Sequence, residues 1–267
     1  YYDYSSGDIM NSPPGSKYNV YIINVGANSI YGFAMPLVSS GASYIVVDND
    51  YADPDFSGVP SKDMKVTAAH EFFHAIQFTI DPRENRWWME ATAVWMEDEV
   101  YDDIDDYLQY FGESHYGADD GWFTIPEVPL DVCDRWHEYG SVVFAKYLSE
   151  NYDRNIIKTI WDGCAGWPSP QSLEAIQNAL GSRGGLADNF KTFTYWNYDK
   201  KKYKEGSLYA PYPTKIARSH YNYPIREQSG NIDHLASNYI EFLPDPRIAT
   251  DATTTQNLRL EISTTTT

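Results

Sequence analysis

The N-terminal part of the chain alternates short apolar runs with turn-forming residues. Three such runs occupy residues 18–25 (YNVYIINV), 30–35 (IYGFAM) and 43–49 (SYIVVDN), and each is bounded by Gly, Pro, Ser or Asn. Runs of this length that are rich in β-branched and aromatic residues are typical of strands. We therefore expect the first part of the chain to form a sheet.

The pattern changes to a helical period after residue 60. Over residues 63–79, apolar side chains recur every three or four positions, as at Val66 and Phe73, and an Asp-Pro pair at 81–82 ends the run. This spacing predicts an amphipathic helix, and a second helix is predicted over residues 86–101.

Later segments show the same helical period in shorter runs. Helices are predicted over residues 102–111, 135–150, 154–162, 170–180 and 186–197. The expected N-cap residues are Asp134, Asp153 and Ser169.

The order of strands first and helices after predicts an α+β fold. Residues 1–200 are expected to form the main domain. Residues 201–230 are rich in Tyr, Pro and Lys without any period, which predicts a linker or long loop. Two strand-like runs, 237–243 and 257–263, predict that residues 231–267 form a β appendage, complete or truncated.

Composition sets limits on the class of protein. The 267 residues are 42% apolar, which is enough for one large domain with its own core. No apolar run approaches the length that spans a bilayer, and the first residues do not resemble a signal peptide. We therefore expect a soluble protein, either cytosolic or already processed. The many Tyr, Asn, Ser and Thr residues favour a secreted or cell-surface protein.

Charge excludes two kinds of partner. The formal net charge of −18 repels nucleic-acid phosphates and anionic membrane surfaces, so we expect neither nucleic-acid binding nor membrane insertion. The same charge is expected to disfavour acidic substrates. Composition does not indicate an oligomeric state.

Residues 70–74 read HEFFH. On a helix, positions i and i+4 lie on one face, so His70 and His74 can present two imidazole nitrogens to one metal ion. Glu71 lies at the edge of that face, where its carboxylate can reach a water molecule on the metal. The pattern predicts a Zn²⁺ site with Glu71 as general base.

A catalytic zinc ion takes three protein ligands, so a third ligand must come from elsewhere. Glu90 lies in the segment RWWMEATAVWMEDEV, among Trp and Ala residues on an otherwise apolar face. An unpaired buried carboxylate is costly, and binding a metal ion removes that cost. Glu97, one heptad further on, is the alternative, but it lies in an acidic run expected to be solvated. Glu90 is the favoured ligand.

HEFFH followed by WWMEA resembles the gluzincin metallopeptidases, and the segments SYIVVDNDY, WMEDEV and HEYGS resemble a family of secreted bacterial metalloproteases. The resemblance covers about residues 18–200 and implies a zincin-like fold. It matches His70, His74 and Glu90 to the zinc ligands and Glu71 to the base. In HEYGSVVFAKYL it places His137 where the aminopeptidase-like branch has a tyrosine that stabilises the transition state.

Two departures and one alternative remain. The spacing from HEFFH to Glu90 is a few residues shorter than in the aminopeptidases, and GFAMP (32–36) lacks their amine-binding glutamate. The chain is therefore interpreted as an endopeptidase that binds extended peptide along an edge strand at residues 44–48.

Tyr139 is the alternative to His137 as the hydrogen-bond donor to the oxyanion of the tetrahedral intermediate. A non-catalytic cell-surface binding or structural module with the same fold is the alternative function.

Other polar residues carry weaker hypotheses. Cys133 and Cys164 bracket two predicted helices, so an antiparallel hairpin is expected to bring them together as a disulfide. The acidic residues at 48–55 and 98–106 either bind Ca²⁺ through oxygen ligands or form a solvated acidic face. The remaining lone histidines are expected to be surface residues: His115, His220 and His234.

Overall fold

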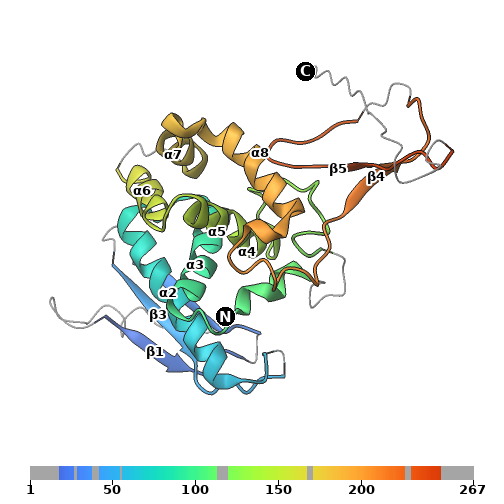
Figure 1. The fold of residues 1–267 in the computed structure, drawn as a ribbon. Coiled ribbons are helices and arrows are strands. Elements are labelled where there is room, and N and C mark those ends of the chain that lie inside the picture. The colour runs from blue at the N-terminus through green and yellow to red at the C-terminus, as the bar shows by residue number, and fades with distance from the viewer. Residues whose placement is uncertain are drawn as a thin grey trace.

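The structure is a computed structural model of the chain. It describes residues 18–26, 29–37, 42–54, 56–112, 120–166, 171–225 and 230–247. Among these residues, helices and two small sheets form a mixed architecture, which confirms the α+β class (Figure 1).

The first sheet contains β1 (Val20–Ile23), β2 (Gly32–Pro36) and β3 (Ser43–Asp48) in the order β1-β3-β2. Strand β3 pairs with β1 in parallel and with β2 antiparallel. The prediction that residues 44–48 form an edge strand is therefore wrong, because β3 is central. Its last four residues are all buried, as expected of a strand covered on both faces.

Strand β2 is an edge of this sheet. It ends at Pro36, which has no backbone N–H to donate and is found in sheets mainly on edge strands. The sheet packs against α2 (Pro60–Ile80) through β2 and β3. Gly32 makes this approach possible, because a Cβ atom there would lie 2.7 Å from Thr67 Cγ2 and 2.8 Å from the Val46 carbonyl oxygen.

Helices α2 and α3 (Arg86–Val100) pack against each other and lie between the sheet and the remaining helices (Figure 1). Both were predicted within a few residues of their observed ends. Helix α2 begins earlier than expected, at Pro60, because proline is well suited to the first helical turn.

The C-terminal helices largely follow the predicted ranges. The predicted helix over 135–150 is divided at Ser141, and the segment 102–111 forms a 3₁₀ helix only over Asp106–Phe111. Asp134 and Asp153 accept backbone hydrogen bonds near the starts of α4 and α6, whereas Ser169 lies outside the described residues. The observed helices are α4 (His137–Gly140), α5 (Val142–Asn151), α6 (Asn155–Gly163), α7 (Ser172–Ala179) and α8 (Gly185–Tyr198).

The main core is aromatic and lies among the helices. Tyr203 and Tyr209, from the segment expected to be a linker, belong to this core and are almost fully buried. The same segment contains β4 (Ile216–His220), which pairs in parallel with β5 (Tyr239–Phe242). The prediction of a linker or long loop over residues 201–230 is therefore wrong at β4. The strand predicted over residues 237–243 is confirmed. The run 257–263 lies outside the described residues.

The expected disulfide is not formed. Cys133 and Cys164 are both free; Cys133 is exposed and Cys164 is fully buried. Helices α5 and α6 do pack together, but Cys133 lies in the loop before α4, where its thiol donates to Glu138 Oε1 at 3.1 Å. The hairpin therefore does not bring the two sulfur atoms together.

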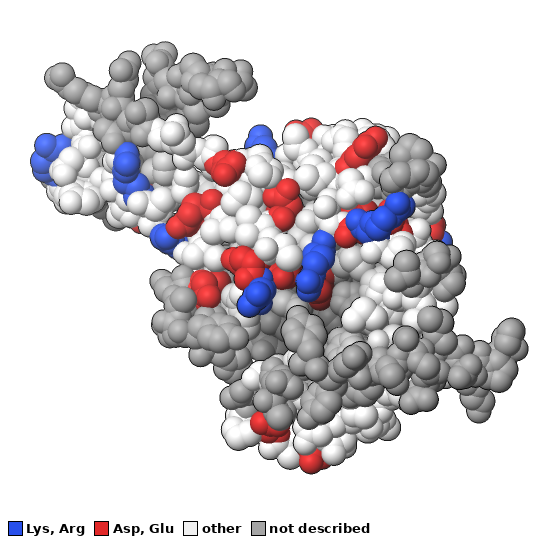
Figure 2. All heavy atoms as spheres, turned by 180° about the vertical axis from the view of Figure 1, so that it is seen from behind, with Lys and Arg blue, Asp and Glu red and all other residues white. Residues whose placement is uncertain are grey.

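The surface charge is not gathered into one patch on the face shown in Figure 2. Acidic and basic side chains alternate across its middle. Within the described part of the chain, no helix has both the length and the apolar character needed to cross a bilayer.

Candidate metal centre

Helices α2 and α3 bring three potential ligand atoms together. His70 Nε2 and His74 Nε2, one helical turn apart on α2, are 3.0 Å from each other. Glu90 Oε2, on the first turn and a half of α3, lies 3.1 Å from His70 Nε2 and 3.2 Å from His74 Nε2. The three residues predicted as zinc ligands thus form one compact group.

The hydrogen bond between His70 Nδ1 and Glu97 indicates the tautomer of His70. His70 Nδ1 lies 2.6 Å from Glu97 Oε1. In its ionised form the Glu97 carboxylate can only accept a hydrogen bond, and Nδ1 of His70 then carries the hydrogen. In the neutral imidazole, Nε2 then keeps its lone pair, which points toward His74 and Glu90.

A second network assigns the tautomer of His74. Gln77 donates through its amide nitrogen to the Met89 carbonyl at 2.9 Å and to Thr92 Oγ1 at 3.0 Å. Its amide oxygen therefore faces His74 Nδ1, at 2.6 Å, and accepts from it. The lone pair of His74 Nε2 also points into the group.

With both imidazoles in these neutral forms, three lone pairs converge without a hydrogen between them. The group therefore needs positive charge among the three atoms, which either a proton on an imidazole or a metal ion can supply. Tetrahedral bonds of about 2.0–2.1 Å to zinc separate ligand atoms by roughly 3.3–3.4 Å, close to the spacing here. Two imidazole nitrogens and one carboxylate oxygen are also a donor set that zinc prefers.

The electrostatics of the group favour positive charge at its centre. Burial alone would lower the pKa of His70, but the carboxylates of Glu90 and Glu97 raise it well above its usual value. Burial alone would raise the pKa of Glu90, but the imidazoles of His70 and His74, when protonated, lower it strongly by hydrogen bonding and by charge. The residues present therefore fit a bound divalent cation.

The second oxygen of Glu90 is held separately. Arg86, one helical turn earlier on α3, donates from Nη2 to Glu90 Oε1 at 3.2 Å. Glu90 therefore offers a single oxygen, Oε2, to the group. Its side chain is only 8% exposed, in agreement with the apolar surroundings inferred from the sequence.

Glu97 was expected to be solvated, and that expectation is wrong. Glu97 and Asp98 are both buried, because α3 packs against α5 as well as α2. Burial raises the pKa of Glu97 to about 7, although His70 lowers it. Glu97 does not join the three-atom group but orients the His70 ring through Nδ1, the nitrogen that faces away from the group. This role and that of Gln77 were not predicted from the sequence. The available signal was their helical spacing, since Glu97 lies two turns after Glu90 and Gln77 lies nearly one turn after His74.

Glu71 lies on the side of the group next to β2. It is 7% exposed, and the backbone N–H of Ala34 donates to its carboxylate. Burial raises the pKa of Glu71, while His70 and His74 partly offset this. Because Ala34 gives its N–H to Glu71, both of its backbone groups face the free edge of β2 and not β3.

Of the two candidates for the oxyanion, the structure brings Tyr139 to the group. The Tyr139 ring lies 6.2 Å from the His70 ring, centroid to centroid, and stacks on Tyr110 at 5.3 Å. Burial and the charge of Glu90 raise the pKa of Tyr139, so its hydroxyl keeps its proton.

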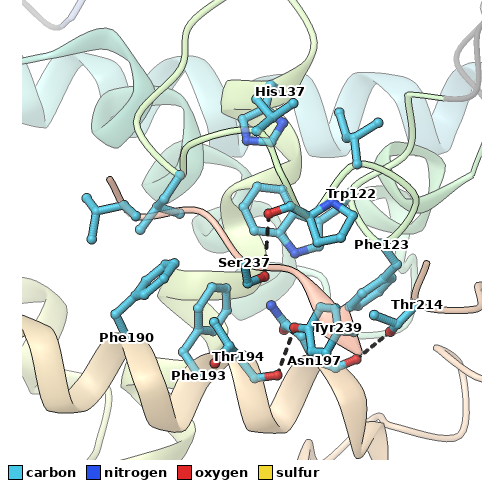
Figure 3. Close-up of a pocket in the computed structure, with 15 residues that line it drawn as sticks. Trp122, Phe123, His137, Phe190, Phe193, Thr194, Asn197, Thr214, Ser237 and Tyr239 are labelled. Carbon is cyan, nitrogen blue, oxygen red and sulfur yellow. Dashed lines mark hydrogen bonds between the residues drawn. The ribbon is translucent and has the colours of Figure 1, made fainter. Parts of the chain in front are cut away.

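His137 lies elsewhere, which corrects its assignment. Residues two apart on a helix point to roughly opposite sides, and His137 stacks on Trp122 at 4.8 Å (Figure 3). It lines a cavity of about 20 Å³ between the loop 122–130, α8 and residues 235–239. This space holds roughly one water molecule, so it cannot accept a peptide.

The acidic segments have structural contacts. Asp48 accepts hydrogen bonds from the backbone N–H groups of Val25, Gly26, Asp50 and Tyr51 and so organises the end of β3.

In the second acidic segment, Asp98 and Asp102 lie close to Glu205, a residue from a later part of the chain. The three carboxylates place oxygen atoms within 4.8 Å of one another. The ammonium of Lys146 lies 2.7 Å from Asp98 Oδ2 and 2.6 Å from Glu205 Oε2, and supplies positive charge there. Calcium binding stays a prediction.

The other histidines are not part of any described group of metal ligands. His220 stacks on Phe242, and exposed His234 pairs with Asp131 and Asp233, while His115 lies outside the described residues.

Comparisons with protein families, with curated proteins and with solved structures found no match to this chain.

Proposed function

We propose that this chain is a zinc-dependent endopeptidase with a zincin-like fold. One observation carries the proposal: His70 Nε2, His74 Nε2 and Glu90 Oε2 lie within 3.0–3.2 Å of one another, with Glu71 beside them. A structural zinc site would be closed by a fourth protein ligand, whereas the described residues supply three to this group, as in catalytic sites.

His70, His74 and Glu90 would hold the ion. Bound there, zinc supplies Lewis-acid polarisation of the scissile carbonyl and lowers the pKa of water to about 7. Glu97 and Gln77 fix the two imidazole rings, and Arg86 leaves Glu90 one oxygen for coordination.

Glu71 is proposed as the general base. Its carboxylate takes a proton from the attacking water and then passes it to the nitrogen of the leaving amine as the C–N bond breaks. Burial raises the pKa of Glu71 toward neutral pH, which improves its fit to both steps. The Ala34 N–H keeps the carboxylate beside β2.

Tyr139 is proposed to stabilise the transition state. Its protonated hydroxyl can donate to the oxygen that becomes negatively charged when water adds to the carbonyl. Its position beside His70 supports this role for Tyr139 over His137.

Strand β2 is proposed to bind the substrate backbone, in the place first expected of residues 44–48. The Ala34 carbonyl faces the free edge beside Glu71, where an extended peptide can pair with it. Residues 32–36 carry no carboxylate to bind a free amine, so cleavage within a chain is expected.

The experiment is metal analysis joined to a digestion assay. The purified chain should contain one zinc ion and cleave casein, chelator should abolish cleavage, and added zinc should restore it. A chain that binds zinc with full occupancy but leaves unfolded protein intact would instead be the non-catalytic module.

A further inference from the structure

Arg86 stands at the rim of the metal centre. It is the first residue of α3, and its Nη2 donates to Glu90 Oε1 at 3.2 Å. The side chain as a whole is nevertheless 68% exposed to solvent. A guanidinium carries five N–H donors in a planar fork, and this one contact leaves several of them for a ligand.

Arg86 also lies on the side of the centre where substrate is expected. Besides Glu90, the charges that act on the guanidinium include those of Tyr139 and Cys133. Tyr139 is the proposed donor to the oxyanion, and Cys133 belongs to the exposed loop before α4. Arg86 therefore lies beside the third ligand, near the wall that carries Tyr139 and the proposed place of the scissile bond.

We propose that Arg86 is a specificity-determining residue that binds a carboxylate of the peptide close to the scissile bond. The inference rests on the proposed peptidase function and adds the substrate class: peptides with an acidic side chain, or a free C-terminal carboxylate, at this position. The planar guanidinium matches a carboxylate in a two-point hydrogen bond, which an amide cannot provide.

This reverses the expectation drawn from net charge. The charge of −18 is spread over the molecule, and at physiological ionic strength its field is screened within about 8 Å. A carboxylate in direct contact with Arg86 responds to that nearby cation more than to distant acidic residues. Local charge then selects a ligand that the whole chain repels.

Binding is measured in a Glu71→Gln background, so that peptides are not cleaved. The peptides share one sequence and differ by Glu against Gln at each position flanking the scissile bond, or by a C-terminal carboxylate against an amide. Each is titrated calorimetrically against protein kept metal-free with chelator and against the zinc-loaded protein. The metal-free arm is needed because a carboxylate can also bind zinc directly.

In one pair, we expect the carboxylate peptide to bind with a Kd three- to tenfold lower than that of its amide partner. The difference should appear in both the metal-free and the zinc-loaded protein. Arg86→Gln should abolish the difference and Arg86→Lys should retain part of it. Arg135→Gln, which removes an exposed arginine from the loop next to α4, is the matched control and should keep it. The responsive pair identifies a side-chain or a terminal carboxylate.

Three results would overturn the inference. The first is equal Kd values within every peptide pair. The second is a difference in Kd that survives Arg86→Gln, and the third is a difference found only in the zinc-loaded protein. Each of these excludes the proposed role of Arg86. Cleavage by the chain with its native Glu71 is followed in parallel on the same peptides. Cleavage without discrimination removes only the Arg86 assignment, whereas neither binding nor cleavage of any peptide removes the peptidase proposal as well.

Discussion

Glu97 Oε1 lies 2.6 Å from His70 Nδ1, on the side of the imidazole opposite to Glu90. The contact joins α3 to α2 and holds His70 in the tautomer and ring orientation that a metal ligand needs. A carboxylate expected to be solvated is thereby a positioning residue for the proposed centre.

Zinc affinity should depend on Glu97. Glu97→Gln keeps an acceptor but loses the charge, so we expect about tenfold weaker zinc binding, and about 100-fold weaker binding for Glu97→Ala. Competition with a chromogenic chelator measures both. Glu99→Gln, two residues away on the same helix, is the control and should bind zinc like the parent chain. Unchanged affinity in Glu97→Ala would show that the contact does not support the site.

Glu71 should be needed for catalysis and not for zinc binding. Glu71→Gln should retain one zinc ion and unfold at the parent temperature, while kcat falls by at least about 100-fold. His74→Ala should lose both zinc and activity. Elemental analysis and peptide hydrolysis on the same preparations separate the two effects. Hydrolysis by Glu71→Gln at the parent rate would contradict the proposed mechanism.

His137 should make stability sensitive to acid. Burial lowers its pKa in the folded chain, although Asp134 and nearby acidic groups partly oppose this. The unfolded chain therefore binds more protons as the pH falls through about 6.5. The resulting loss of stability is at most about 1.4 kcal/mol per pH unit for one proton.

Urea unfolding at pH 7.5 and pH 5.5 tests this. His137→Phe keeps a ring against Trp122 but cannot be protonated, so it should lose less stability between these pH values than the parent chain does. Equal losses in the two proteins would show that His137 does not contribute.

Lys146 should be essential for stability. Its buried ammonium pairs with Asp98 and Glu205, so Lys146→Met leaves uncompensated carboxylates in the core and should cost about 3–5 kcal/mol. The exposed pair Lys158–Asp162 provides the control, since Lys158→Met should change stability by about 0.5 kcal/mol or less. Denaturant midpoints distinguish the two. A loss as small as that of Lys158→Met would refute the importance of this pairing.

The cysteines should remain separate thiols with different reactivity. Partial desolvation of the sulfur and the hydrogen bond to Glu138 raise the pKa of Cys133 to about 11, so this thiol should be alkylated slowly at pH 8 in the folded protein, although the residue is exposed. Cys164 should react only after unfolding, because it is fully buried. Mass spectrometry of the alkylated, unreduced protein counts the thiols. Absence of both adducts after denaturation would show that the disulfide exists after all.

Local spacing predicted much of the centre. His70 and His74 share a face of α2 because the helical period depends only on the backbone between them. Glu90 was identified by its apolar neighbours, which indicated burial on α3. Helix ranges were predicted for the same reason, since turn and capping residues act within a few positions.

Contacts between distant segments decided the rest. The central place of β3 depends on its pairing with β1 and β2, and the burial of Glu97 depends on the helices packed around α3. The break at Ser141 separates α4 from α5, and packing of α4 then brings Tyr139 to the centre and His137 to Trp122. The sequence by itself determined which residues can share a helix face, because that geometry is local. Only the tertiary structure decided which faces meet, because that depends on the packing of the whole core.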